Sequence, residues 1–160
     1  MKKLIRGFTL IELLVVIGVI AILAAIVLVA VNPSRNFAQA RNTQRRNDIY
    51  QVLNACHQYA VSNDGNFPTG IPIGSANAIE LGTCGTCLDL STIIDKNNNV
   101  FVSSYIPAIP IDPSSTVGSA ANTGYFVFQE SVGGRLTASA SAGTEGPGYG
   151  ELGEKITITR

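Results

Sequence analysis

Residues 2–31 read KKLIRGFTLIELLVVIGVIAILAAIVLVAV, and this stretch decides how the rest of the chain is interpreted. Three cations and a glycine come before an apolar run, residues 8–31, which contains a single charged side chain, Glu12. An ionisable carboxylate inside hydrocarbon costs several kcal/mol unless it finds a partner. A chain that keeps one there is expected to use it, so Glu12 is the first candidate functional residue.

The apolar run is long enough to cross a membrane. Its 24 residues extend about 36 Å as a helix, compared with about 30 Å for the hydrocarbon layer. The preceding cations are expected to keep the N-terminus in the cytoplasm, which places everything after Val31 across the membrane. A secretory signal peptide is the alternative, but its apolar core is usually about 7–15 residues, and Leu28-Val29-Ala30 is a poor cleavage site because Leu28 is large.

Composition allows one globular domain beyond the membrane segment. The chain has 160 residues, with 11 basic and 11 acidic side chains. Setting aside Lys2, Lys3 and Arg6 leaves 8 basic against 11 acidic. This balance does not indicate a nucleic-acid partner.

The helical pattern breaks at Asn32-Pro33 and resumes from Arg35 to about Val61. One face of this second part is apolar at helical spacing, with Ile49, Val52, Leu53, Cys56 and Ala60. Gly65 is expected to end the helix in a left-handed conformation. Residues 67–95, rich in Gly and Pro, read as irregular.

Three segments near the C-terminus predict an antiparallel sheet of about three strands: 125–130, 136–142 and 155–159. Residues 132–135 are expected to form a tight hairpin turn. In the second strand Leu136, Ala138 and Ala140 alternate with polar residues, which predicts one apolar face. The helix stripe is the natural cover for that face. We therefore expect an α+β fold, in which a long N-terminal helix packs its amphipathic half on a small antiparallel sheet.

The N-terminus resembles the type IV pilins and the type II secretion pseudopilins. Residues 2–7 match the short basic leader ending in glycine, and residues 8–14, FTLIELL, match the start of the mature chain, with Glu at its fifth position. The resemblance implies that prepilin peptidase cuts between Gly7 and Phe8 and that the new amine of Phe8 is N-methylated. It divides the chain into a leader (1–7), a transmembrane and filament-core helix (8–31) and an extracytoplasmic pilin-like domain (32–160).

The same resemblance implies a function for Glu12. Its carboxylate would pair with the Phe8 amine of a neighbouring subunit and so set subunit register; the alternative is a carboxylate that reaches the headgroup layer. The chain would be a structural subunit of a type IV pilus or a type II secretion-like filament, with neither catalysis nor a cofactor. It would lie in the bacterial inner membrane, among lipid, before it enters a cell-surface or periplasmic filament.

The implied partners are prepilin peptidase, copies of the chain and related pilins, and an inner-membrane assembly platform with its ATPase. A single-pass, membrane-anchored binding or sensor module that does not polymerise is the alternative function.

Cys56, Cys84 and Cys87 follow the membrane segment, where disulfides can form. A Cys84–Cys87 disulfide that rigidifies a loop is the first interpretation, and a bridge from Cys56 to either is the second. A thiol oxidoreductase would need its CxxC at the start of a helix in a βαβ unit, and the order here is wrong. Cys56 and His57 with the CxxC have zinc-ligand chemistry, but adjacent helical positions point about 100° apart, so we expect no metal site and treat His57 as a polar surface residue.

Two further charged groups are candidates. Arg35, Arg41, Arg45 and Arg46 could meet anionic headgroups or nucleic acid, although such a run is more typical of a solvated or interface face. Glu145, Glu151 and Glu154 lie among glycines, but they form no recognisable calcium-ligand pattern.

Overall fold

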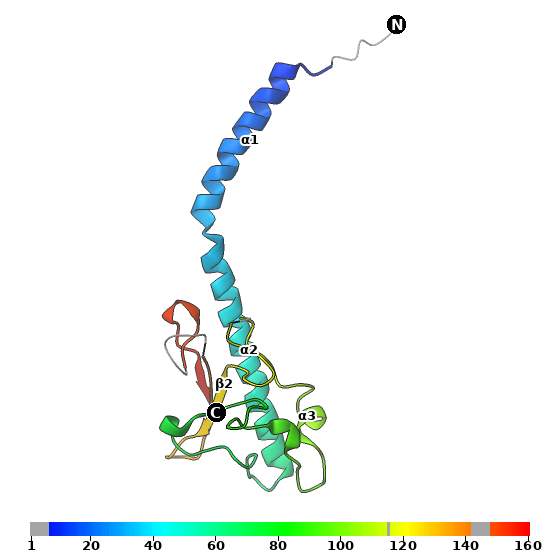
Figure 1. Cartoon of the computed structure of the whole chain (residues 1–160), viewed down its shortest axis with the longest axis vertical. Coiled ribbons are helices and arrows are strands. Elements are labelled where there is room, and N and C mark those ends of the chain that lie inside the picture. The colour runs from blue at the N-terminus through cyan, green and yellow to red at the C-terminus, as the bar shows by residue number, and fades with distance from the viewer. Residues whose placement is uncertain (1–6, 115, 142–147) are drawn as a thin grey trace. The chain divides into compact units, whose positions relative to one another are not determined.

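The computed structural model describes residues 7–114, 116–141 and 148–160 (Figure 1). The chain divides into two compact units, Met1–Phe37 and Ala38–Arg160, which are described separately. The long helices are α1 (Leu10–Val31) and α2 (Pro33–Ser62), and the strands are β1 (Ile79–Glu80), β2 (Tyr125–Gln129), β3 (Leu136–Ala140) and β4 (Thr157–Thr159). Short helical segments are η1 (Ser75–Asn77), η2 (Leu90–Thr92), α3 (Phe101–Ser104) and η3 (Glu151–Gly153).

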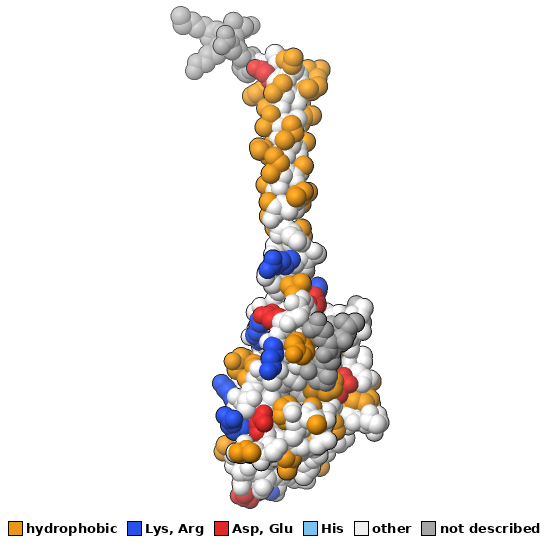
Figure 2. Space-filling model, turned by 90° about the vertical axis from the view of Figure 1, so that its left-hand side faces the viewer, with side chains coloured by type: hydrophobic (Ala, Val, Ile, Leu, Met, Phe, Trp, Pro, Cys, Tyr) orange, Lys and Arg blue, Asp and Glu red, His pale blue; other side chains and the backbone are white. Residues whose placement is uncertain are grey.

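α1 is apolar on all sides and buries none of its residues. Figure 2 shows apolar side chains along its whole visible face. Among the described residues it is the one helix whose length and composition would let it cross a membrane. It ends at Asn32, which adopts a left-handed φ of 43°, and α2 begins at Pro33. The predicted break is confirmed, and proline is tolerated there because the first helical N–H has no intrahelical partner.

The predicted apolar stripe of α2 is confirmed as the helical side of the core. Ile49, Val52, Leu53, Cys56 and Ala60 are all buried. The first four of these pack with buried side chains of the sheet and of the loops around α3, so α2, the sheet and these loops share a single core. After Ser62 the Gly65 N–H donates to the Ala60 carbonyl over 2.8 Å at a φ of 87°, the left-handed termination expected of glycine.

The sheet has four antiparallel strands in the order β1-β2-β3-β4. Three of them lie within the predicted segments, although each is shorter. The end of the second predicted segment, residue 142, falls outside the described residues. The fourth strand, β1, was not predicted, because it has only two residues and shows no periodic pattern. The β2–β3 turn is confirmed, with positive φ at Gly133 and Gly134.

The prediction that β3 has one apolar face is confirmed for Leu136, Ala138 and Ala140, but its polar face is buried too. Thr137 is 1% exposed and Ser139 is 3% exposed. β3 lies between two strands, and the Thr137 hydroxyl makes hydrogen bonds with Glu130 (3.0 Å) and with the Thr159 hydroxyl (2.8 Å). Hydroxyls are tolerated at such buried positions when they have partners of this kind.

Candidate functional site

The Gly7–Phe8 peptide bond lies in an exposed, non-helical segment just before α1. Both residues are exposed, Phe8 to 91% of its maximum. A Cβ added at Gly7 would meet nothing within 4 Å, so no described neighbour requires glycine here. An exposed, irregular segment is also the kind of backbone that peptidases cut most readily. The leader residues 1–6 lie outside the described residues.

Glu12 lies in the first turn of α1 and is held by Thr9, the residue that caps the helix. Its Oε2 accepts hydrogen bonds from the Thr9 N–H and the Thr9 hydroxyl, each over 2.8 Å. In return the Glu12 N–H donates to the Thr9 Oγ over 3.3 Å, which completes a capping box. The sequence analysis missed this contact, although Thr9-x-x-Glu12 before an apolar run is its recognised signature.

The capping box also places the carboxylate where it is favourable. A negative charge in the first turn faces the positive end of the helix dipole and satisfies N–H groups that have no intrahelical partner. Among the described residues Thr9 occupies only one carboxylate oxygen, Oε2. Oε1 remains available to a further donor.

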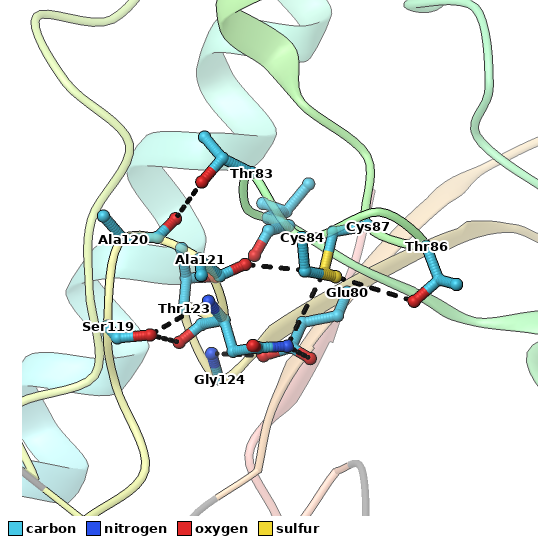
Figure 3. The surroundings of a disulfide bond; sticks show 12 residues. Glu80, Thr83, Cys84, Thr86, Cys87, Ser119, Ala120, Ala121, Thr123 and Gly124 are labelled. Atoms are coloured by element: carbon cyan, nitrogen blue, oxygen red, sulfur yellow. Dashed lines mark hydrogen bonds between the residues drawn. A yellow bond between two sulfur atoms is a disulfide. The ribbon is translucent and has the colours of Figure 1, made fainter.

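Cys84 and Cys87 are joined by a disulfide in the loop after β1, with their Cα atoms 5.0 Å apart (Figure 3). Cys87 lies against the 119–124 loop, with its Sγ 3.5 Å from the Ala121 carbonyl oxygen. The Glu80 carboxylate holds the same loop by accepting from the Gly124 N–H and from the Asn122 amide, each over 2.9 Å. The disulfide is thus part of the packing of two loops at one end of the sheet.

Cys56 is the third cysteine, and its thiol is free and buried on the core face of α2. Burial raises its pKa to about 12. A bridge from Cys56 to the loop, the second sequence interpretation, is not present in this structure.

A family model described as the prokaryotic N-terminal methylation motif matches residues 2–28. This match supports a type IV pilin-like or pseudopilin-like protein. The match contains the exposed Gly7–Phe8 bond and the capped Glu12. The searches of curated proteins and of solved structures gave no match.

The motif supports a type IV pilin-like substrate of prepilin peptidase, and it suggests a structural rather than an enzymatic protein. With α1 it is consistent with anchoring in a membrane. The globular unit lies beyond the matched residues, and its fold is an α+β arrangement of a long helix on an antiparallel sheet.

His57 is not the polar surface residue that the sequence predicts. Its ring is half-buried and lies edge-on to Phe67, with centroids 5.3 Å apart, and its Nε2 is buried without a hydrogen-bond partner. Within residues 7–114, 116–141 and 148–160, no group of three or more His, Cys, Asp or Glu side chains is arranged to hold a metal ion.

Arg45 corrects the interpretation of the arginine run as a solvated face. Both Arg45 and Asp112 have fully buried side chains, and they form a two-pronged ion pair at 2.6 and 2.8 Å. Arg45 also donates to the Asn42 Oδ1 over 2.8 Å and contacts Glu151 at 3.3 Å. The partners lie 67 and 106 residues further along the chain, so no local pattern could indicate them.

The flanking arginines pair with the segment around η3. Arg41 forms an ion pair with Glu151, and Arg46 forms one with Glu154; these pairs are half-exposed. The Arg41 guanidinium holds the pKa of Glu151 below its usual value. Of the three glutamates considered as calcium ligands, Glu151 and Glu154 therefore form ion pairs with arginines. The third, Glu145, lies outside the described residues.

Proposed function

We propose that this chain is the structural subunit of a pilus or pseudopilus filament. It is made as a membrane precursor, cut after Gly7 and N-methylated on Phe8. Residues 8–31 then serve as a membrane anchor and afterwards as the filament core, and residues 32–160 form the extracytoplasmic domain. The observation that best supports this is α1 itself, which is almost entirely apolar, buries none of its residues within the chain and retains one charge, in its first turn.

Glu12 is proposed to select and align the incoming subunit. In the uncut chain Thr9 satisfies only one of its carboxylate oxygens. Cleavage creates an α-amine on Phe8, and the amine of a neighbouring copy can reach the carboxylate when the two helices are displaced along their axes. At 4 Å such a pair gains about 1 kcal/mol in water but about 4 kcal/mol at an effective dielectric constant near 20. An apolar filament core therefore strengthens this pairing.

The surface of α1 permits close packing with other helices. Its small residues include Gly18, Ala21, Ala24 and Ala25. Small residues let helix backbones approach closely, so the same surface can contact lipid before assembly and other helices afterwards. The proposed partners are prepilin peptidase, copies of the chain and related pilins, and an inner-membrane platform with its ATPase.

The test compares Glu12→Gln with Glu12→Ala in cells that make the full chain and its assembly machinery. Gln retains an oxygen that can cap with Thr9 but has no charge, whereas Ala loses both. Intact-mass measurement should show that both variants lose residues 1–7 and gain one methyl group. Electron microscopy should show filaments only for the unaltered chain. Abundant filaments from Glu12→Gln would refute the role of the charge.

The same mass measurement separates the alternative function. A native chain that still begins at Met1 would identify a single-pass, anchored binding or sensor module that does not polymerise. Loss of the leader with methylation supports the subunit.

A further inference from the structure

A cavity of about 370 Å³ lies on the face of the sheet opposite to the core. This volume falls within the range of small-molecule sites, about 300–1,000 Å³. Successive side chains of a strand point to opposite faces of a sheet, so the strand residues that line the cavity alternate with core residues. They are Phe128, Thr137, Ser139, Thr157 and Thr159. We call this space the hydroxyl cavity.

Two cross-strand pairs of β3 and β4 supply these hydroxyls, and only one pair satisfies its own hydrogen bonds. Thr137 lies opposite Thr159, and their hydroxyls bond to each other over 2.8 Å. Ser139 lies opposite Thr157 in the same register, yet neither hydroxyl has a hydrogen-bond partner among the described residues. Ser139 is only 3% exposed, and a hydroxyl buried to this extent normally has a partner. The Ser139 hydroxyl can therefore bond to a molecule in the cavity.

The charged side chains that line the hydroxyl cavity have opposite signs. They are Glu130 and Lys155, and neither takes part in an ion pair among the described residues. One charge of each sign favours neither an anion nor a cation as the ligand. A carboxylate accepts hydrogen bonds, an ammonium group donates them and a hydroxyl does both. Together these groups suit a neutral ligand that has many hydroxyls.

The hydroxyl cavity also has apolar surface. Phe128, which is 7% exposed, and Ala78 line it together with the polar groups. A sugar ring has hydroxyls around its rim and C–H groups on its two faces, so it matches both kinds of surface. A small inorganic ion would leave the apolar surface unmatched, and an aliphatic ligand would leave the hydroxyls without partners.

We propose that the hydroxyl cavity binds a neutral monosaccharide. Ser139 and Thr157 donate to and accept from its hydroxyls, the Glu130 carboxylate accepts from another, and Phe128 contacts its C–H groups. This site lies wholly within the globular unit and goes beyond the proposed function, because it requires neither leader removal nor polymerisation.

The test measures binding of D-glucose, D-galactose and N-acetyl-D-glucosamine to the purified full chain by saturation-transfer difference NMR. The chain is kept in a phosphocholine detergent, since a glucoside or maltoside detergent would itself present a sugar. At least one of the three sugars should give a saturable signal, and its titration gives the Kd. Methyl phosphate serves as the anionic probe and should give no saturable signal.

Three variants locate the binding. Ser139→Ala removes one neutral hydrogen bond to the sugar and should raise the Kd about three- to tenfold. It should not lower the melting temperature, because the hydroxyl that it removes has no partner among the described residues. Ala78→Leu adds bulk to the cavity wall and should abolish the signal. Ser131→Ala is the matched control, on an exposed serine of the β2–β3 turn that does not line the cavity, and it should leave the Kd unchanged.

Each outcome supports or overturns the sugar site. No saturable signal from any of the three sugars overturns it, and so does binding of methyl phosphate alone, which would indicate an anion site at Lys155. A Kd that Ser139→Ala does not change, or a signal that survives Ala78→Leu, would place the binding elsewhere on the chain. None of these results bears on the filament, since leader removal and filament formation are measured separately.

Discussion

Asp112→Ala removes one half of the buried ion pair that joins α2 to the chain before β2. Both side chains are fully buried, and the Asp112 carboxylate meets the Arg45 guanidinium at two points. Breaking a buried pair by removing one partner typically costs about 3–5 kcal/mol, because the remaining charge is left uncompensated. In this variant Arg45 still donates to the Asn42 amide oxygen and still contacts Glu151. We therefore expect a loss in the free energy of unfolding at the lower end of this range, about 3 kcal/mol.

The measurement is urea unfolding of the purified full chain in detergent, followed by the near-ultraviolet circular dichroism of the tyrosines. Lys96→Ala is the control, since it removes an ion pair with Asp64 whose side chains are 46% and 75% exposed. An exposed pair of this kind contributes about 0–1 kcal/mol, and solvent screening places the expected loss near the bottom of that range.

A double variant tests the physical reason. Replacing both members, as Arg45→Met with Asp112→Leu, removes the uncompensated charge together with the pair. It should destabilise the chain less than Asp112→Ala alone. If Asp112→Ala unfolds within about 1 kcal/mol of the unaltered chain, or if the double variant is the less stable of the two, the reasoning from buried charge is wrong.

Three further outcomes follow from the pKa values of groups in the globular unit. The Tyr105 hydroxyl lowers the pKa of Asp95 to about 2, below its unfolded value of about 3.9. Its stabilising contribution is therefore complete above about pH 4 and is lost as the pH falls through 2; urea midpoints measured from pH 5 to 2 should fall less for Asp95→Asn. Burial raises the pKa of Cys56 to about 12, so iodoacetamide at pH 8 should add no label to the folded chain and one after unfolding, as read by mass spectrometry; labelling before unfolding would contradict the burial. Burial also raises the pKa of Asp48, although the Tyr125 hydroxyl donates a hydrogen bond to its carboxylate. The folded state therefore favours the neutral carboxyl, and the charged carboxylate lowers the free energy of unfolding at high pH. Asp48→Asn should raise the melting temperature at pH 7, by a margin that shrinks at pH 4; an equal change at both pH values would count against this explanation.

Features that depend on neighbours in the chain could be predicted from the sequence. The membrane-length helix, the break at Pro33 and the buried stripe from Ile49 to Ala60 all follow from local periodicity. The candidate cleavage site and Glu12 could be named because the motif that contains them is contiguous. The capping box of Thr9 with Glu12 could also have been predicted, because its sequence signature spans only four residues, but it was not among the predictions.

Features that depend on distant partners could not be predicted in this way. Arg45 looks like one more cation on a polar helix until the fold brings Asp112 and Glu151 to it. β1 has only two residues, and it forms a strand because it pairs with β2.

The sequence by itself thus determined the helix, its single charge and the motif around the Gly7–Phe8 bond, because hydrophobic transfer and helix capping act over a few consecutive residues. The tertiary structure alone decided which charges are buried and how β1 completes the sheet. Those outcomes depend on groups that are far apart in the chain, and only the packed core brings them within contact distance.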